Sequence, residues 1–205
     1  MNMTPEQLTY AGRHAVKARD WATVDMCAKE ILARDENSAE GHFLHGLVEK
    51  VSNHPVKSAD AFARALQIDA SRHDAAIELA AQYTVAQRNT EAVDLLDRYR
   101  EHLDNSPLYL DMAATTYTNI GLPETAWPLY KKATELQPEA DLFRANLAAC
   151  SVYLGKIDEA DRLYRGLLEK NPNHQRNHYY LSRLAAAKDD AHVEQMKNVL
   201  AATNL

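Results

Sequence analysis

The stretch GLPETAWPLYKKATELQP, residues 121–138, decides the fold because it returns 34 residues later as GKIDEADRLYRGLLEKNP, residues 155–172. Tyr130 of the first copy corresponds to Tyr164 of the second. Self-similarity at a fixed spacing of this length indicates a repeat architecture, in which each copy is one small structural unit. The sequence therefore predicts a row of repeated units.

A period of 34 residues divides the chain without gaps into five units and a partial sixth. The units begin at Pro5, Ala39, His73, Pro107 and Asp141, and the partial unit begins at Gln175. With the first residue of each unit counted as place 1, place 8 is small in every copy, as Gly12, Gly46, Ala80, Ala114, Ala148 and Ser182. The small place 20 and the mostly bulky place 24 are Val24 and Ala28, Ser58 and Phe62, Ala92 and Leu96, Ala126 and Tyr130, and Ala160 and Tyr164.

Helical periodicity dominates the chain, and alternating β-branched runs are missing, so the fold class is all-α. Each unit is predicted to hold two helices, the first over about places 1–13 and the second after Gly or polar residues near place 15. Small side chains at places 8 and 20 let the two backbones approach closely, and place 24 inserts a larger side chain between units.

These residues resemble the tetratricopeptide repeat, a 34-residue helix-turn-helix unit with small residues at places 8 and 20, an aromatic residue at 24 and proline at 32. Pro138 and Pro172 match the last feature, whereas Ala28 replaces the aromatic residue in the first unit. The resemblance covers nearly the whole chain and implies a right-handed α-solenoid forming a single domain over residues 1–205. Its units are residues 5–38, 39–72, 73–106, 107–140 and 141–174, followed by a C-terminal helical pair over 175–205. An irregular helical bundle is the alternative.

After Asp189 the repeat pattern stops, and Val193, Met196 and Leu200 form one apolar stripe. A solenoid needs a terminal element that covers the last repeat. The stripe therefore predicts a C-terminal capping helix.

The composition limits the classes of partner. Twenty-three basic and 29 acidic residues give a formal net charge of -6, which favours neither a phosphate backbone nor an anionic membrane, and no basic patch carries interleaved aromatic residues. No apolar run approaches the roughly 18 residues that span a bilayer, and the N-terminus lacks a signal-peptide pattern, so a cytoplasmic location is expected. Cys27 and Cys150, both in helical patterns, are predicted to be small buried side chains.

No catalytic motif is present: the sequence lacks a nucleophile elbow, a phosphate-cradling glycine loop and a Cys-x-x-Cys pair. His42, His45 and Glu49 could share a helix face, and His174 and His178 are four residues apart, which are spacings that metal sites use. The first two histidines occupy packing places, and the second pair lacks a third ligand, so both sets are interpreted as structural. We expect no catalysis, no cofactor and no metal.

The resemblance implies that the first helices line a concave groove whose ligands contact places 2, 5, 6, 9, 12 and 13. The partner would be a protein or peptide. The candidate groove residues are Arg13, Lys17, Phe43, Leu47, Lys50, Ile77, Asp111, Thr115, Asn119, Asn146, Tyr153, Arg176, Tyr180 and Arg183. Tyr and Arg give large contact area and charge-assisted hydrogen bonds, so the cluster from Arg176 to Arg183 is the predicted hot spot. Its alternative role is to cover the junction with the capping helix.

Three further interpretations stay open. Part of the family clamps the C-terminal carboxylate of chaperones, and here Asn146 and Arg176 suit that role, but Asp111, Thr115 and Tyr180 break the set. Residues 177–200 resemble the junction between tetratricopeptide repeats and a sulfotransferase domain in bacterial proteins, which implies a substrate-recruiting arm of a larger enzyme. Repeat proteins with poorly capped ends also pair, so a homo-oligomer through the terminal helices is the third.

Overall fold

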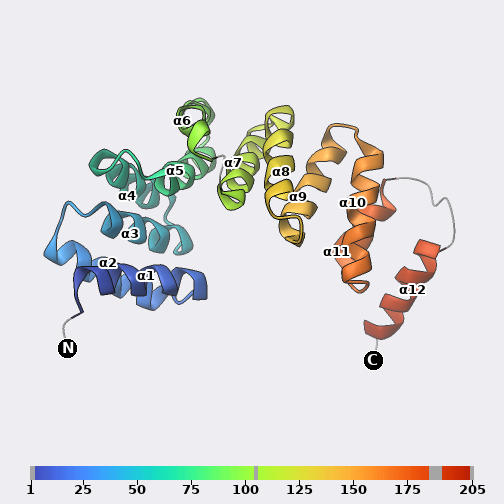
Figure 1. Cartoon of the computed structure of the whole chain (residues 1–205), viewed down its shortest axis with the longest axis horizontal. Coiled ribbons are helices and arrows are strands. Elements are labelled where there is room, and N and C mark those ends of the chain that lie inside the picture. The colour runs from blue at the N-terminus through green and yellow to red at the C-terminus, as the bar shows by residue number, and fades with distance from the viewer. Residues whose placement is uncertain (1–2, 104–105, 185–190, 204–205) are drawn as a thin grey trace. The chain divides into compact units, whose positions relative to one another are not determined.

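The computed structural model describes residues 3–103, 106–184 and 191–203, without the side chains of residues 191, 202 and 203. The regular structure of these residues is α-helical throughout, which confirms the all-α class (Figure 1). The chain forms two compact units, Met1–Asn105 and Ser106–Leu205. Since the contacts divide the chain in this way, the single continuous solenoid over residues 1–205 stays a prediction.

Within each unit, every helix packs against the next helix in the chain. The first unit contains α1 (Pro5–Ala18), α2 (Trp21–Arg34), α3 (Ala39–Val51), α4 (Pro55–Ile68), α5 (His73–Val85) and α6 (Asn89–Leu103). The second unit contains α7 (Pro107–Ile120), α8 (Pro123–Leu136), α9 (Asp141–Tyr153), α10 (Ile157–Lys170), α11 (Gln175–Ser182) and α12 (Ala191–Thr203). The first helix of each repeat begins at place 1 and the second at place 17, as the period predicts.

The turn between the two helices of a repeat contains a residue with positive φ in all five copies. Place 15 has a positive φ throughout, at Arg19 (57°), Asn53 (60°), Gln87 (61°), Gly121 (89°) and Gly155 (69°). Glycine adopts this left-handed conformation without penalty and asparagine tolerates it, whereas other side chains clash with the neighbouring carbonyl. Two of the five repeats, with Arg19 and Gln87, therefore hold a strained residue at this turn.

The small residues at places 8 and 20 bring the paired helices into contact, as predicted. Ser58 Oγ donates a hydrogen bond of 2.9 Å to the backbone oxygen of Gly46. A Cβ atom at Gly46 would stand only 2.6 Å from the ring of Phe62, so glycine is required there. The place-24 residues Ala28, Phe62, Leu96, Tyr130 and Tyr164 are all buried.

The C-terminal helix α12 contacts α11, and here the sequence prediction is partly wrong. Leu200 is 63% exposed, and the buried residues of α12 are instead His192 and Val199. The buried face is therefore rotated from the predicted stripe of Val193, Met196 and Leu200. The residues that connect the two helices lie outside the described part of the chain.

Candidate functional site

A cavity of about 280 Å³ lies in the second unit, among α9, α10 and α11. The places that the resemblance assigns to ligand contact line it. Helix α9 contributes Leu142, Ala145, Asn146 and Ala149, at places 2, 5, 6 and 9, and α11 contributes Arg176 and Tyr180, at places 2 and 6. Three predicted groove residues, Asn146, Arg176 and Tyr180, are thus brought together around one hollow.

Asn146 connects this cavity to α7. Its Nδ2 donates a hydrogen bond of 2.8 Å to Oδ1 of Asp111, which is 5% exposed. Burial raises the pKa of the Asp111 carboxyl, and the hydrogen bond from Asn146 lowers it by less. Asp111 is therefore an interior group that holds Asn146 in place, and little of its own surface is left for a ligand.

Arg176 and Tyr180 form a stacked pair with Tyr164 beneath them. Arg176 donates to the hydroxyl of Tyr180 through Nε at 3.2 Å and Nη2 at 3.1 Å. The Tyr180 ring stacks on that of Tyr164, with centroids 5.5 Å apart. The Tyr164 hydroxyl is buried and has no hydrogen-bond partner among the described residues. Burial raises its pKa to about 12, so at neutral pH it keeps its proton and can donate.

Exposed apolar and aromatic side chains lie on the same helices. Leu142 is 59% exposed, Tyr153 75% and Tyr179 54%. Arg183, itself exposed, donates to the Tyr179 hydroxyl at 2.7 Å. Neither Tyr153 nor Arg183 lines the cavity. Leu142 and Tyr164 are absent from the predicted groove set, although place 2 of the repeat could have pointed to Leu142.

The two remaining candidates of the second unit lie on α7 and are exposed. Thr115 Oγ1 and the Tyr130 hydroxyl are 3.0 Å apart and share a hydrogen bond. Asn119 is exposed near the end of the helix. Neither residue lines the α9–α11 cavity.

In the first unit, Arg13 is held by carboxylates of two other repeats. It donates to Glu40 through Nε at 2.6 Å and Nη2 at 2.7 Å, and to Asp74 at 2.8 Å. Burial lowers the pKa of the Arg13 guanidinium, but the hydrogen bonds and charges of the two carboxylates outweigh it and raise the pKa. Arg72 also pairs with Glu40, at 3.0 Å, and with Asp74, at 2.9 Å.

Packing accounts for most of the other candidates of the first unit. Phe43, Leu47 and Ile77 are 4%, 6% and 0% exposed, and the Phe43 ring lies under the guanidinium groups of Arg13 and Arg72, 4.4 and 4.7 Å from its centroid. Two lysines are also candidates here. Lys50 Nζ lies 2.6 Å from Glu78 Oε2, whereas Lys17 is exposed. A role in ligand contact stays a prediction for these residues, of which Lys17 and Lys50 are exposed.

The histidines pair with protein groups. His42 Nε2 lies 2.9 Å from the backbone oxygen of Glu36, and His178 lies 3.1 Å from His192 and 2.7 Å from the backbone oxygen of Pro172. Among the described residues no group of three or more His, Cys, Asp or Glu side chains could hold a metal ion. Within the same residues, no helix is both long and apolar enough to cross a membrane.

Solved structures share the arrangement of helices over most of the chain. YrrB, described as a TPR protein with an unusual peptide-binding site, is 19% identical, covers 87% of this chain and 98% of its own, and has a TM-score of 0.66. TTC0263, a thermophilic TPR protein in Thermus thermophilus, is 13% identical, covers 88% of this chain and 98% of its own, and has a TM-score of 0.70. The chain has the tetratricopeptide-repeat fold. No protein-family model and no curated protein matches the sequence.

The tetratricopeptide-repeat fold also occurs with a different ligand. An IFIT1 monomeric mutant with m7Gppp-AAAA is 17% identical and has a TM-score of 0.75, and the match covers 97% of this chain and 50% of that one. The fold alone therefore does not select one class of ligand. The class of ligand has to be inferred from the side chains that line the cavity.

Proposed function

We propose that the chain is a non-catalytic scaffold that binds a polypeptide segment on the face formed by α9 and α11. The observation that carries this proposal is the cavity of about 280 Å³ lined by the ligand places of both helices. Clefts that bind ligands combine apolar walls with a few polar groups that fix orientation. Leu142, Ala145 and Ala149 supply the walls here, and Asn146 and Arg176 supply the polar groups.

Arg176 is the polar anchor of this site. Its guanidinium donates to a tyrosine hydroxyl, and no carboxylate among the described residues pairs with it. A backbone carbonyl or a side-chain oxygen of a polypeptide can accept from it, and a hydrogen bond to a charged group is stronger than a neutral one. Asn146 adds an amide whose second N–H is not used by Asp111.

The exposed side chains around the cavity provide contact area. Tyrosine and arginine are enriched among the residues that dominate binding energy. Tyr179 and Tyr153 are both more than half exposed, as is Leu142 at the cavity itself. An extended segment that lies along α9 and α11 would cover these side chains and place one of its own in the cavity.

A selected peptide tests this function. Twelve-residue peptides of degenerate sequence, acetylated and amidated at their ends, are selected on the immobilised chain, and the affinity of a retained peptide is measured by fluorescence anisotropy. Leu142→Ala and Tyr179→Ala should each weaken binding about tenfold, the loss typical of an interface hot spot. Leu136→Ala is the matched control, because Leu136 is 49% exposed and does not line the cavity. Retention of no peptide, or equal affinity of all variants, would remove the support for this function.

Four more specific expectations from the sequence remain predictions. They are the cytoplasmic location, the absence of a nucleic-acid partner, the pairing of two copies through terminal helices, and the carboxylate clamp for chaperone tails. The alternative function is a substrate-recruiting arm of a sulfotransferase. The similarity to tetratricopeptide-repeat structures tests neither the recruiting role nor the attachment to a sulfotransferase domain.

A further inference from the structure

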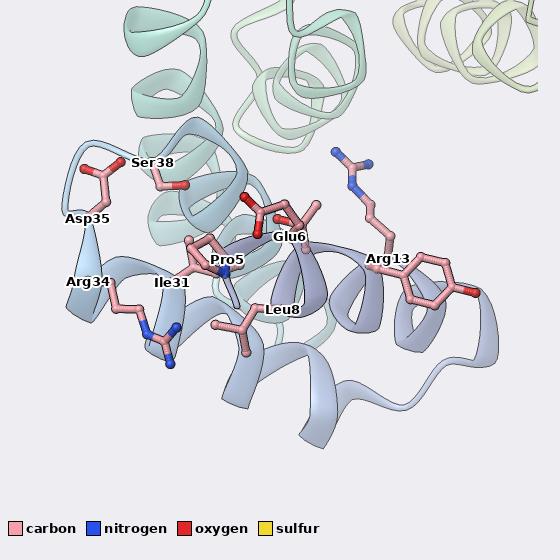
Figure 2. Close-up of a pocket in the computed structure, with 10 residues that line it drawn as sticks. Pro5, Glu6, Leu8, Arg13, Ile31, Arg34, Asp35 and Ser38 are labelled. Carbon is pink, nitrogen blue, oxygen red and sulfur yellow. The ribbon is translucent and has the colours of Figure 1, made fainter. Parts of the chain in front are cut away.

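A second cavity, of about 690 Å³, lies in the first unit between the start of α1 and the end of α2 (Figure 2). It shares places 1, 2, 5, 6 and 9 of the first helix and places 27, 31 and 34 with the cavity of the second unit, although that cavity is also lined by α11 and this one has no residue from α3. The repeat thus produces a similar hollow twice, with different side chains around it. The side chains decide what each hollow can bind.

The floor of this cavity is apolar. Leu8 and Ile31 line it but are only 2% and 7% exposed, so most of the apolar surface open to a ligand belongs to Pro5 and Tyr10, which are exposed. Tyr10 stands at its edge with 74% of its surface exposed. An aliphatic chain that enters the cavity would cover apolar surface of Pro5 and Tyr10 above the buried Leu8 and Ile31.

The rim of the cavity is negative. Glu6 and Asp35 line it, both are exposed, and neither forms an ion pair with a described residue. In the view of Figure 2 they lie on either side of Pro5 and Ile31. Asp35 is also the C-cap of α2, where the partial negative charge of the helix end favours a cation.

The positive charges of the two arginines that line the same cavity are already paired with carboxylates. Arg34 pairs with Glu30 at 2.6 Å and donates to the backbone oxygen of Met3. Arg13 is held by the carboxylates of Glu40 and Asp74. The carboxylates of Glu6 and Asp35 are therefore the rim charges that form no ion pair with a described residue, although Asp35 Oδ1 accepts a hydrogen bond of 3.0 Å from the backbone N–H of Asn37 and Glu6 is hydrogen-bonded by Thr4.

We propose that this cavity binds a basic side chain, arginine or lysine, of a partner polypeptide. The aliphatic stem lies against Pro5 and Tyr10 above the buried Leu8 and Ile31, and the cation lies beside Glu6 and Asp35. Long basic side chains commonly bury their stems on apolar surface and keep the charged end at a polar rim. The exposed ring of Tyr10 offers a face for a cation as well.

Two peptide libraries that differ in one group test the inference. Both are degenerate twelve-residue peptides, acetylated and amidated, with a fixed central arginine in one and its uncharged analogue citrulline in the other. The full chain should retain the arginine library about tenfold more strongly, as one charge-assisted contact supplies. The double change Glu6→Gln and Asp35→Asn should remove this preference. Asp60→Asn, at an exposed carboxylate of α4 outside the cavity, should leave it unchanged.

Two results would overturn the inference. One is equal retention of the two libraries by the unchanged chain. The other is a preference for arginine that survives the double change, because the cation would then bind elsewhere. The function proposed for α9 and α11 is tested by substitutions in the second unit only, so either idea can fail while the other stands.

Discussion

Arg13 on α1 and Glu40 on α3 are joined by two parallel hydrogen bonds of 2.6 and 2.7 Å, which tie the first helices of two successive repeats together. Asp74 on α5 extends the link to a third repeat. Since the Arg13 side chain is 38% exposed, solvent weakens these interactions. Arg13→Gln leaves two carboxylates less compensated and should lower the free energy of unfolding by about 1–2 kcal/mol. Urea denaturation measures it.

An exposed ion pair provides the control for this prediction. Arg88 pairs with Glu91 at 2.7 Å, with both side chains about half exposed. Arg88→Gln should change the free energy of unfolding by less than about 0.5 kcal/mol. An equal loss of unfolding free energy in the two variants would mean that the Arg13 link between repeats stabilises the fold no more than an exposed ion pair does.

Substitutions at the place-15 turns test backbone strain separately from side-chain contacts. Gln87 has a φ of 61°, so Gln87→Gly should relieve strain and raise the free energy of unfolding by about 0.5–1 kcal/mol. Gly121→Ala should lower it by about 1 kcal/mol, although a Cβ there meets no atom within 4 Å. Thermal unfolding of the two variants measures both effects. A stabilised Gly121→Ala would contradict the assignment of strain to these turns.

Two helix glycines should respond in opposite directions to alanine. A Cβ at Gly46 meets the Phe62 ring at 2.6 Å, so Gly46→Ala should destabilise by about 1–2 kcal/mol despite the better helix propensity of alanine. At Gly166 the atom met is the flexible Nη2 of Arg144, at 2.5 Å, so Gly166→Ala should stabilise by about 0.5–1 kcal/mol. Chemical denaturation of the two variants measures whether each change raises or lowers the free energy of unfolding. Destabilisation of both would show that close packing at place 8 is not the cause.

The buried Asp111 predicts a pH dependence. Burial raises its pKa in the folded state above the unfolded value of about 3.9. Between the two pKa values the folded state binds more protons than the unfolded state, so stability falls as the pH rises through that window. Asp111→Asn keeps an acceptor for Asn146 and removes this loss. Its stability relative to the unchanged chain should be higher at pH 7 than below pH 4, measured by urea denaturation.

Asp20 should show the opposite slope and serves as the control. The hydrogen bond from the Thr23 side chain is the largest cause of its lowered pKa. The stability that Asp20 contributes is present at neutral pH and is lost as the pH falls through its folded pKa. If Asp20→Asn and Asp111→Asn changed stability with pH in the same sense, the burial argument for Asp111 would be wrong.

The repeat register could be predicted from the sequence because it depends on small and bulky residues at fixed spacing. Gly46, Phe62 and Tyr130 are at contacts that the period alone specifies. The register also predicted that Asn146, Arg176 and Tyr180 share one surface. At these positions the repeat pattern and the packing agree, so the sequence alone predicts them.

Other features depend on contacts that the period does not encode. The period places Arg13 in the predicted groove set, and it does not reveal that the carboxylates at place 2 of the next two repeats, Glu40 and Asp74, bind it. Leu200 was assigned to a buried stripe, yet the pairing of His178 with His192 accompanies a different buried face of α12. The period places Tyr164 in the packing between units, and only its surroundings show that its hydroxyl, at the cavity, has no hydrogen-bond partner among the described residues.

The most direct test of the central claim is amide chemical-shift mapping of the ¹⁵N-labelled chain during titration with a peptide selected from the degenerate library. We expect the largest shifts at Ala145, Ala149 and Tyr180, and a loss of about tenfold in affinity for Arg176→Gln, with Arg162→Gln unchanged because Arg162 is exposed on α10 and does not line the cavity. Shifts confined to α8 and the exposed residues of α10, with equal affinity for both arginine variants, would contradict the claim that the α9–α11 cavity is a polypeptide-binding site.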